Sequence, residues 1–228
     1  MATDIRSEID YPSCDGKPMA DNTLQYQWMV TIKEGLEACL PVEPSVFVAS
    51  DLLWYPVEGE PTINMAPDVL VAIGRPKGHR MSYKQWEEGG IAPQVVFEIL
   101  SASNDQWEMA DKLDAYDTYG VEEYYVYDPH RNRLMGYHRK GTVFRRIRAM
   151  PGWVSPRLRS RFEVGDTLAI FGPDGEQFLT YQELHEQRQK ERARAAQEKQ
   201  RADRAEGRVE QLLEKLRQQG IDPSAASL

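Results

Sequence analysis

The sequence predicts an α/β protein in which helices flank a mixed central sheet and a long helix follows at the C-terminus. The first observation is the order of elements: a helical pattern, three short apolar runs, a second helix and a fourth run. The second is residues 180–219, where Gly207 is the only glycine or proline and Glu, Gln, Arg, Lys and Ala dominate. We therefore predict a flexible arm (1–21), a globular α/β domain (22–175) and a charged helical tail (176–228).

Local patterns define the individual elements. Asn22 or Thr23 is suited to cap a helix that ends near Leu40, because apolar residues then recur every four positions and Pro41 disfavours a helical residue before it. Short apolar runs bounded by Gly, Pro or Asp predict strands. The predicted strands are 45–50, 68–73, 94–100, 124–127, a hairpin of 131–137 with 142–147, and short strands within 153–171. Residues 74–90 are expected to form a long loop, and residues 105–119 a second helix capped by Ser103, Asn104 or Asp105.

The tail carries a seven-residue repeat typical of coiled coils. Ala195, Ala202, Val209 and Leu216 occupy one seam position, and Ala205 and Leu212 occupy the other, which Glu198 interrupts. We expect the tail to join two copies into a homodimer. A single charged helix is the alternative.

Composition narrows the class of protein. Cys14 and Cys39 are the only cysteines among 228 residues, too few for a disulfide framework or a cysteine-rich zinc site. No apolar run approaches the ~18 residues that span a bilayer, and the first twenty residues lack the apolar core of a secretory signal. We therefore expect a cytoplasmic protein without a membrane segment.

The charge is unevenly distributed along the chain. The net charge is −8, yet residues 130–162 carry 10 basic and no acidic side chains. Basic clusters bind the phosphates of nucleic acids, so we select as candidate DNA contacts Arg139, Lys140, Arg145, Arg146 and Arg148. The alternative is a solvated hairpin face whose charges balance the acidic remainder or pair with a partner subunit.

The central stretch carries the residues that metal-dependent phosphodiester hydrolysis requires. Asp68 opens one predicted strand, and Glu98 lies inside the next apolar run, where a carboxylate must be paired, metal-bound or catalytic. Lys112 shares the apolar face of the second helix with Met109 and Tyr116. Two carboxylates can bind Mg²⁺ or Mn²⁺, and a nearby lysine can stabilise developing negative charge. Asp51, at a strand end, is a secondary candidate.

Each of these residues also has a structural interpretation. Asp68 follows a proline and is equally well explained as a solvated turn residue. Lys112 and Glu98 can form a buried ion pair without any catalytic role. Asp105 is better explained as a helix cap than as a ligand.

The runs PDVLVAI, FEILSASN and DKLDAYDTYGVEEYYVYDP resemble the putative restriction endonuclease family of the PD-(D/E)XK nuclease superfamily. The resemblance covers roughly residues 20–175 and extends to the tail sequence LRQQGIDP. It implies a restriction-endonuclease-like core with Asp68 and Glu98 as metal ligands. The superfamily's lysine normally follows the acid by two residues, where this chain has Leu100. The chain is similar to the variant with the lysine on the following helix, which again indicates Lys112.

The leading hypothesis is a Mg²⁺- or Mn²⁺-dependent endonuclease acting on DNA, with Asp68, Glu98 and Lys112 as catalytic residues. The second is a catalytically inactive DNA-binding or assembly protein on the same fold, whose DNA binding would persist in EDTA. A hydrolase of small phosphorylated substrates is a third, which long DNA would fail to inhibit.

Overall fold

A computed structural model describes residues 9–40, 45–101 and 106–219, and its centre is a six-stranded sheet in the order β1-β3-β5-β6-β7-β8. The strands are β1 (Val46–Ala49), β3 (Val69–Ile73), β5 (Val95–Ile99), β6 (Glu123–Asp128), β7 (Arg133–Lys140) and β8 (Val143–Arg146). β5 and β6 are parallel, and the other neighbours in the sheet are antiparallel. The predicted mixed α/β core is therefore confirmed, as is the hairpin of β7 and β8.

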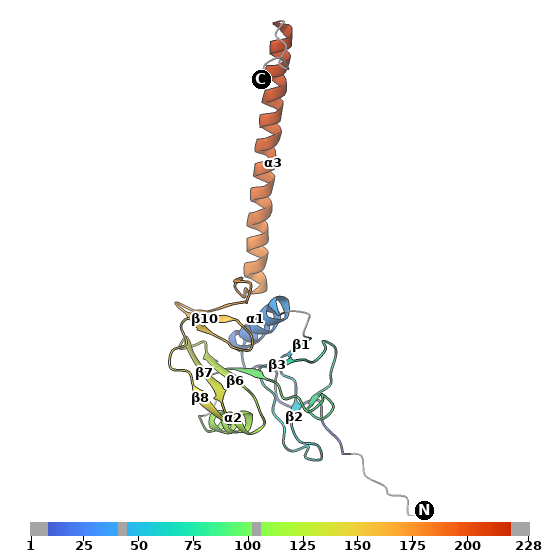
Figure 1. The fold of residues 1–228 in the computed structure, drawn as a ribbon, viewed down its shortest axis with the longest axis vertical. Coiled ribbons are helices and arrows are strands. Elements are labelled where there is room, and N and C mark those ends of the chain that lie inside the picture. Colours follow the sequence, from blue (N-terminus) through green and yellow to red (C-terminus); the bar gives the residue numbers. More distant parts are fainter. Residues whose placement is uncertain (1–8, 41–44, 102–105, 220–228) are drawn as a thin grey trace, which may run out of the picture. The chain divides into compact units, whose positions relative to one another are not determined.

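Helices α1 (Thr23–Cys39) and α2 (Gln106–Thr118) cover opposite faces of this sheet (Figure 1). Because side chains alternate along a strand, each strand divides its residues between two apolar layers. In β3, Val69 and Val71 pack on the α1 side, whereas Leu70 and Ala72 pack on the α2 side. Each large apolar side chain that is fully buried contributes about 1.5–3 kcal/mol, so the two layers hold the helices against the sheet.

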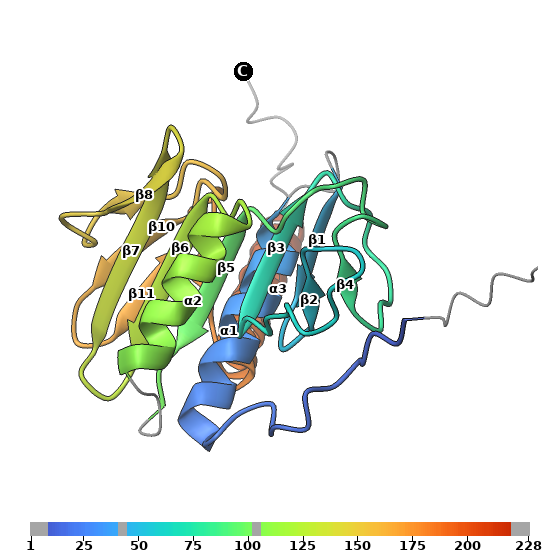
Figure 2. The ribbon, with the colours of Figure 1, turned by 90° about the horizontal axis from the view of Figure 1, so that it is seen from below.

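Two smaller sheets complete the layers. On the α1 side lie β9 (Trp153–Val154), β10 (Arg161–Val164) and β11 (Leu168–Phe171). On the α2 side, β2 (Trp54–Tyr55) pairs in parallel with β4 (Tyr83–Lys84), beside β1 and β3 (Figure 2). The predicted long loop at 74–90 thus contains a strand. Local pattern missed it because it is two residues long and is stabilised by distant Trp54.

Residues 9–21 contact the globular domain, in contrast to the flexible arm predicted over 1–21. The Tyr11 ring packs against Tyr55 and Trp86, with ring centroids 5.2 and 5.0 Å apart. The Tyr11 hydroxyl accepts a hydrogen bond from the Gly59 amide at 2.6 Å. These partners lie more than forty positions away in the sequence, so local pattern gave no sign of them.

The chain divides into two compact units, residues 1–180 and 181–228. The second unit contains α3 (Tyr181–Gln218), in which no residue is buried. Across the described residues, none of the helices combines the length and apolar character needed to cross a membrane.

Candidate functional site

Strand register brings the two predicted carboxylates together. β3 and β5 pair antiparallel with Val69 opposite Phe97, so continuing this register by one residue places Asp68 opposite Glu98. Residues two positions apart in a strand lie on the same face. Asp68 therefore shares the α2 face with Leu70, and Glu98 shares it with Val96. Asp68 is 9% exposed and Glu98 is 3% exposed. The two carboxylates therefore share one buried position beneath α2.

The Asp68 carboxylate is held by the strand beside it. Its Oδ2 accepts a hydrogen bond from the backbone amide of Ile99 at 2.6 Å. The side-chain amide of Gln25 in α1 donates to the Ile99 carbonyl at 3.1 Å. Ile99 therefore contacts Asp68 through its amide and the start of α1 through its carbonyl. Burial and the charge of Glu98 raise the pKa of Asp68 to about 7, against the opposing effects of the Ile99 amide and Lys112. Asp68 is therefore poised to change protonation near neutral pH.

The Glu98 carboxylate is held by two side chains from successive turns of α2. Lys112 Nζ donates to Oε2 at 2.8 Å, and the Tyr116 hydroxyl donates to Oε1 at 2.5 Å. Residues four apart on a helix lie on one face, which is why both reach the same carboxylate. Burial opposes the positive charge of Lys112, but Glu98, Asp68 and Glu108 together raise its pKa. Lys112 is accordingly a protonated cation between carboxylates.

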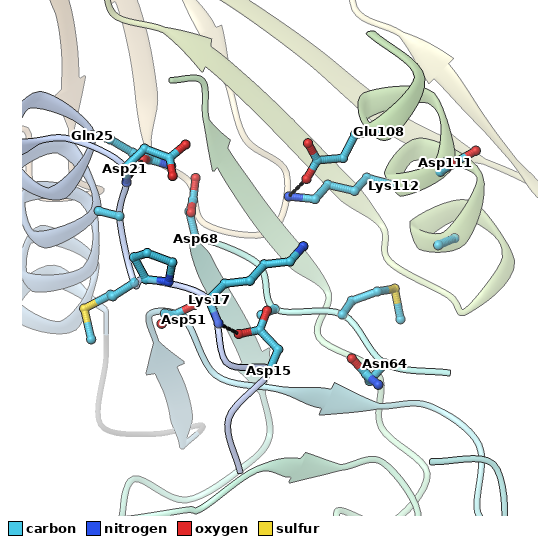
Figure 3. Close-up of a pocket in the computed structure, with 16 residues that line it drawn as sticks. Asp15, Lys17, Asp21, Gln25, Asp51, Asn64, Asp68, Glu108, Asp111 and Lys112 are labelled. Atoms are coloured by element: carbon cyan, nitrogen blue, oxygen red, sulfur yellow. Dashed lines mark hydrogen bonds and ion pairs between the residues drawn. The ribbon is translucent and has the colours of Figure 1, made fainter. Parts of the chain in front are cut away.

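A pocket of about 540 Å³ opens over these residues (Figure 3). Its wall includes Asp68 and Lys112 but not Glu98, which Lys112 and Tyr116 cover. The charged side chains lining it are six carboxylates and two ammonium groups, namely Asp15, Asp21, Asp51, Asp68, Glu108, Asp111, Lys17 and Lys112. The pocket is therefore acidic and suited to cations.

Asp51, the secondary candidate, lies in the wall of this pocket. Its backbone adopts a positive φ of 50°, uncommon for a residue with a side chain. Burial, Asp15 and Glu98 raise its pKa to about 6. The structure thus brings Asp51 to the same site as Asp68.

The donor set of this site fits a hydrated Mg²⁺ or Mn²⁺ ion. Mg²⁺ prefers oxygen ligands and usually binds through one or two carboxylates while keeping several waters. Asp68 and Glu98 supply that number. Burial first and neighbouring carboxylates second raise the pKa of Asp51 and of Asp68, and a divalent cation would offset the repulsion between these carboxylates. In the part of the chain that the structure describes, no group of three or more His, Cys, Asp or Glu could hold a metal ion. An ion held here would therefore bind through one or two carboxylates and keep several waters.

Arg139, selected from sequence as a DNA contact, is occupied within the protein. Its guanidinium donates to the carbonyls of Val121 at 2.9 Å, Asp117 at 2.6 Å and Thr142 at 2.8 Å, and pairs with the Asp117 carboxylate at 2.9 Å. It joins the end of α2 to the β7–β8 hairpin. We therefore leave Arg139 out of the proposed DNA surface.

The other four basic candidates are exposed but do not line the pocket. Lys140 ends β7, Arg145 and Arg146 lie in β8 at the sheet edge, and Arg148 follows β8. Arg145 and Arg146 point to opposite faces of the sheet, since successive strand residues alternate. These cations therefore do not form one continuous surface around the site.

Several residues of the site were absent from the sequence-based candidates, and three of them, Tyr116, Gln25 and Lys17, bear on its proposed chemistry. Tyr116 and Gln25 had a detectable signal, because each is a polar side chain on the apolar face of its helix. Gln25 follows the observed N-cap Asn22 by three positions, which favours a capping role and conceals its contact with Ile99. Lys17 had no signal, because its place in the pocket depends on how the N-terminal segment is fastened.

The chain was compared with known proteins. Among solved structures it is similar to a putative nuclease belonging to DUF820 from Anabaena variabilis ATCC 29413, with 16% sequence identity and a TM-score of 0.46 over 63% of this chain and 79% of that chain. A likeness this distant adds no argument about function. No curated protein matches the chain. The Uma2 family profile, described as "Putative restriction endonuclease", matches residues 24–164. Since this match spans more than half of the sequence and includes Asp68, Glu98 and Lys112, the chain belongs to the Uma2 family of putative restriction endonucleases.

Proposed function

We propose that the protein is an endodeoxyribonuclease that uses Mg²⁺ or Mn²⁺, with Asp68 and Glu98 holding the ion. The observation that carries this proposal is the β3–β5 register, which sets Asp68 opposite Glu98 on the face from which Lys112 approaches. The ion, when bound, supplies positive charge at the phosphate and lowers the pKa of a bound water.

The protein's own residues preorganise this site. The Ile99 amide orients Asp68, and Tyr116 and Lys112 orient Glu98, so the fold fixes both carboxylates in place. An ion that binds Glu98 would displace one of its two protein donors. Lys112 carries three N–H donors, of which its bond to Glu98 uses one. A second donor can serve a phosphate oxygen in the pocket and stabilise the charge that develops there.

DNA is the proposed substrate because of the family and the exposed cations of the β7–β8 region. The pocket itself is acidic, so it supplies little attraction for a polyanion without a metal ion. Lys140, Arg145, Arg146 and Arg148 can supply phosphate contacts outside the pocket, and their contribution would weaken with salt. We propose these four as the DNA-binding residues.

One observation favours the alternative of a nuclease-fold protein that binds DNA without cutting it. Both oxygens of Glu98 already have protein donors, and Lys112 neutralises its charge at 2.8 Å. A carboxylate satisfied in this way is stable without a metal. The two functions differ in their metal requirement, because binding alone would persist in EDTA.

The decisive test is cleavage of plasmid and single-stranded DNA in Mg²⁺, Mn²⁺ or EDTA by the wild type and by Glu98→Ala and Glu98→Gln. We expect metal-dependent cleavage that both variants reduce to background. Lys112→Ala should lower kcat about 100- to 1,000-fold, which is the loss typical of removing one preorganised electrostatic donor.

Glu98→Gln retains an acceptor for Tyr116, so it separates loss of chemistry from loss of folding. The matched control is Glu87→Gln, an exposed glutamate paired with Lys84 outside the pocket. Undiminished cutting by Glu98→Gln would overturn the assignment. DNA binding in EDTA, with no cleavage by the wild type in either metal, would establish the alternative.

We also propose that α3 pairs two copies of the chain. Its seam residues Val209 and Leu212 are 54% and 60% exposed, and large exposed apolar side chains at heptad spacing are typical of an interface between helices. Sedimentation should give twice the mass of one chain, and a Val209→Glu/Leu212→Glu variant should give a monomer. A monomeric wild type at micromolar concentration would contradict this arrangement.

A further inference from the structure

The segment of residues 13–20 crosses the mouth of the pocket between two points of attachment. At its start, Tyr11 packs between Tyr55 and Trp86, and the Tyr55 hydroxyl donates to the Pro12 carbonyl at 2.7 Å. At its end, the Ser101 hydroxyl donates to Asp21 Oδ2 at 2.6 Å. We call residues 13–20 the crossing segment. It is held at both ends by the body of the domain, so its position over the pocket is set by the fold.

The second attachment connects the crossing segment to the proposed metal site through a short chain of hydrogen bonds. The Asp21 amide donates to Gln25 Oε1 at 2.8 Å, and the Gln25 amide nitrogen donates to the Ile99 carbonyl. The Ile99 amide in turn holds Asp68. The segment and the carboxylate are therefore joined through Gln25 and one residue of β5.

Lys17 is the cation that the crossing segment brings to the pocket. It lines the pocket, and Figure 3 shows its side chain extending inward from the segment toward the side where α2 carries Lys112. Its backbone amide donates to Asp15 Oδ1 at 2.9 Å, which folds the segment locally around it. Among the described residues, its ammonium group makes no ion pair or hydrogen bond.

The absence of a partner distinguishes Lys17 from Lys112. Lys112 is committed to Glu98 at 2.8 Å and lies 3.8 Å from Glu108. Lys17 is exposed and lies outside the residues 24–164 that the family profile matches. An ammonium group with three unused donors at the mouth of a catalytic pocket is suited to an incoming anionic oxygen.

We propose that Lys17 binds a phosphate of the DNA backbone next to the scissile bond, so that the N-terminal segment forms part of the active site. This inference rests on the proposed nuclease function. Lys17 also gives this acidic pocket a positive charge that is not committed to a protein carboxylate. Hydrogen bonds to charged groups are about twice as strong as neutral ones, which makes one such contact measurable.

The test compares Lys17→Ala and Lys17→Arg with Lys190→Ala, which removes an equal charge from the exposed surface of α3. Lys17→Ala should lower kcat/KM about 10- to 100-fold, Lys17→Arg should restore most of it, and Lys190→Ala should match the wild type. Binding to a DNA duplex in Ca²⁺, measured by anisotropy against salt, should show the slope of log K against log salt reduced by about 0.9 for Lys17→Ala, corresponding to one phosphate contact.

A double-mutant cycle with Tyr11→Ala tests whether Lys17 needs the attached segment. Tyr11 lies outside the pocket, and its removal detaches the start of the segment without altering Lys17 itself. Tyr11→Ala should reproduce most of the loss, and the double variant should be no worse than Lys17→Ala alone. Circular dichroism should confirm that each variant is folded.

The outcomes separate this inference from the proposed function. A wild type that cuts DNA, with Lys17→Ala equally active and an unchanged salt slope, would overturn the role of Lys17 alone. Faster cleavage by Lys17→Ala would also overturn it, because the segment would then obstruct the substrate. A wild type that neither cuts nor binds DNA would overturn both.

Discussion

Asp68 and Glu88 are equally buried, at 9% exposure each, yet their surroundings have opposite electrostatic effects. Glu88 accepts from Arg80 at 2.6 Å and from Arg75 at 2.7 Å, and these arginines outweigh burial and lower its pKa. Asp68 has the like charge of Glu98 beside it, and burial and that charge raise its pKa to about 7. Equal exposure therefore does not give two carboxylates the same pKa, because the arginines beside Glu88 offset its burial and the charges beside Asp68 do not.

The comparison also explains the two loop arginines near Glu88. Arg75 and Arg80 are part of the basic loop 74–90, and their charges could be mistaken for a phosphate-binding set. Arg80 instead stacks over Phe47, with its guanidinium carbon 3.8 Å from the ring centre, while it pairs with Glu88. The two arginines of the loop thus neutralise Glu88 of the same loop. The pocket around Asp68, in contrast, keeps a surplus of negative charge.

The largest effect should come from breaking the Glu88 cluster. Glu88→Ala leaves two largely buried guanidinium groups without their carboxylate, and removing one partner of a buried ion pair typically costs about 3–5 kcal/mol. Urea denaturation should show this loss of unfolding free energy. The control is Glu87→Ala, whose surface pair with Lys84 is worth less than about 1 kcal/mol. A loss below about 1 kcal/mol for Glu88→Ala would remove the contrast with Asp68.

The opposite sign is expected at Asp68. The Asp68 carboxyl has a pKa of 3.8 in the unfolded chain and of about 7 in the fold. Between these pH values the folded state binds more protons than the unfolded state. The wild type therefore loses stability as pH rises from about 4 to 7. Asp68→Asn keeps an acceptor for the Ile99 amide without the charge. In EDTA at pH 8 it should be more stable than the wild type by about 2 kcal/mol, which is less than the full shift because relaxation softens it.

The gap between Asp68→Asn and the wild type should shrink steadily between pH 8 and pH 5 in thermal denaturation. This pH dependence separates a charge effect from a packing effect, since improved packing would stabilise the variant equally at both pH values. Equal or lower stability of the variant at pH 8 would show that Lys112 already neutralises Asp68.

The smallest effect should be the stabilisation of the wild type by metal. Mg²⁺ at ten times its dissociation constant should add about 1.4 kcal/mol, or roughly 3–5 °C in Tm, and more at pH 8 than at pH 6 because Asp68 must be ionised. Asp68→Asn should lose this shift, whereas Glu87→Ala should keep it. A Tm shift retained by Asp68→Asn would place the ion elsewhere.

Much of the fold follows from local sequence. Asn22 caps α1 through its side chain, and the apolar repeat of Ile32 and Leu36 determines the buried face of that helix. The strands β3 and β5 lie within the runs that predicted them, because short apolar runs rich in β-branched residues and preceded by Pro favour buried strands. The long α3 follows from a sequence with almost no helix-breaking residue. Each depends on contacts within a few positions along the chain.

The site was only partly predictable. Alternation along each strand indicates which face Asp68 and Glu98 occupy, but that they lie opposite one another depends on the pairing of Val69 with Phe97. Arg139 connects α2 to the hairpin through the carbonyls of Val121 and Asp117, which is why we no longer select it as a DNA contact. No local sequence pattern reveals these carbonyl partners.

The sequence by itself thus determined the helices, most of the strands and the choice of Asp68, Glu98 and Lys112 as candidates, because periodicity and apolar context are local properties. The tertiary structure alone decided the register that joins those residues, the raised pKa of Asp68 and the place of Lys17 over the pocket. These arise from groups far apart in the sequence, whose desolvation and Coulomb interactions exist only once the chain has folded.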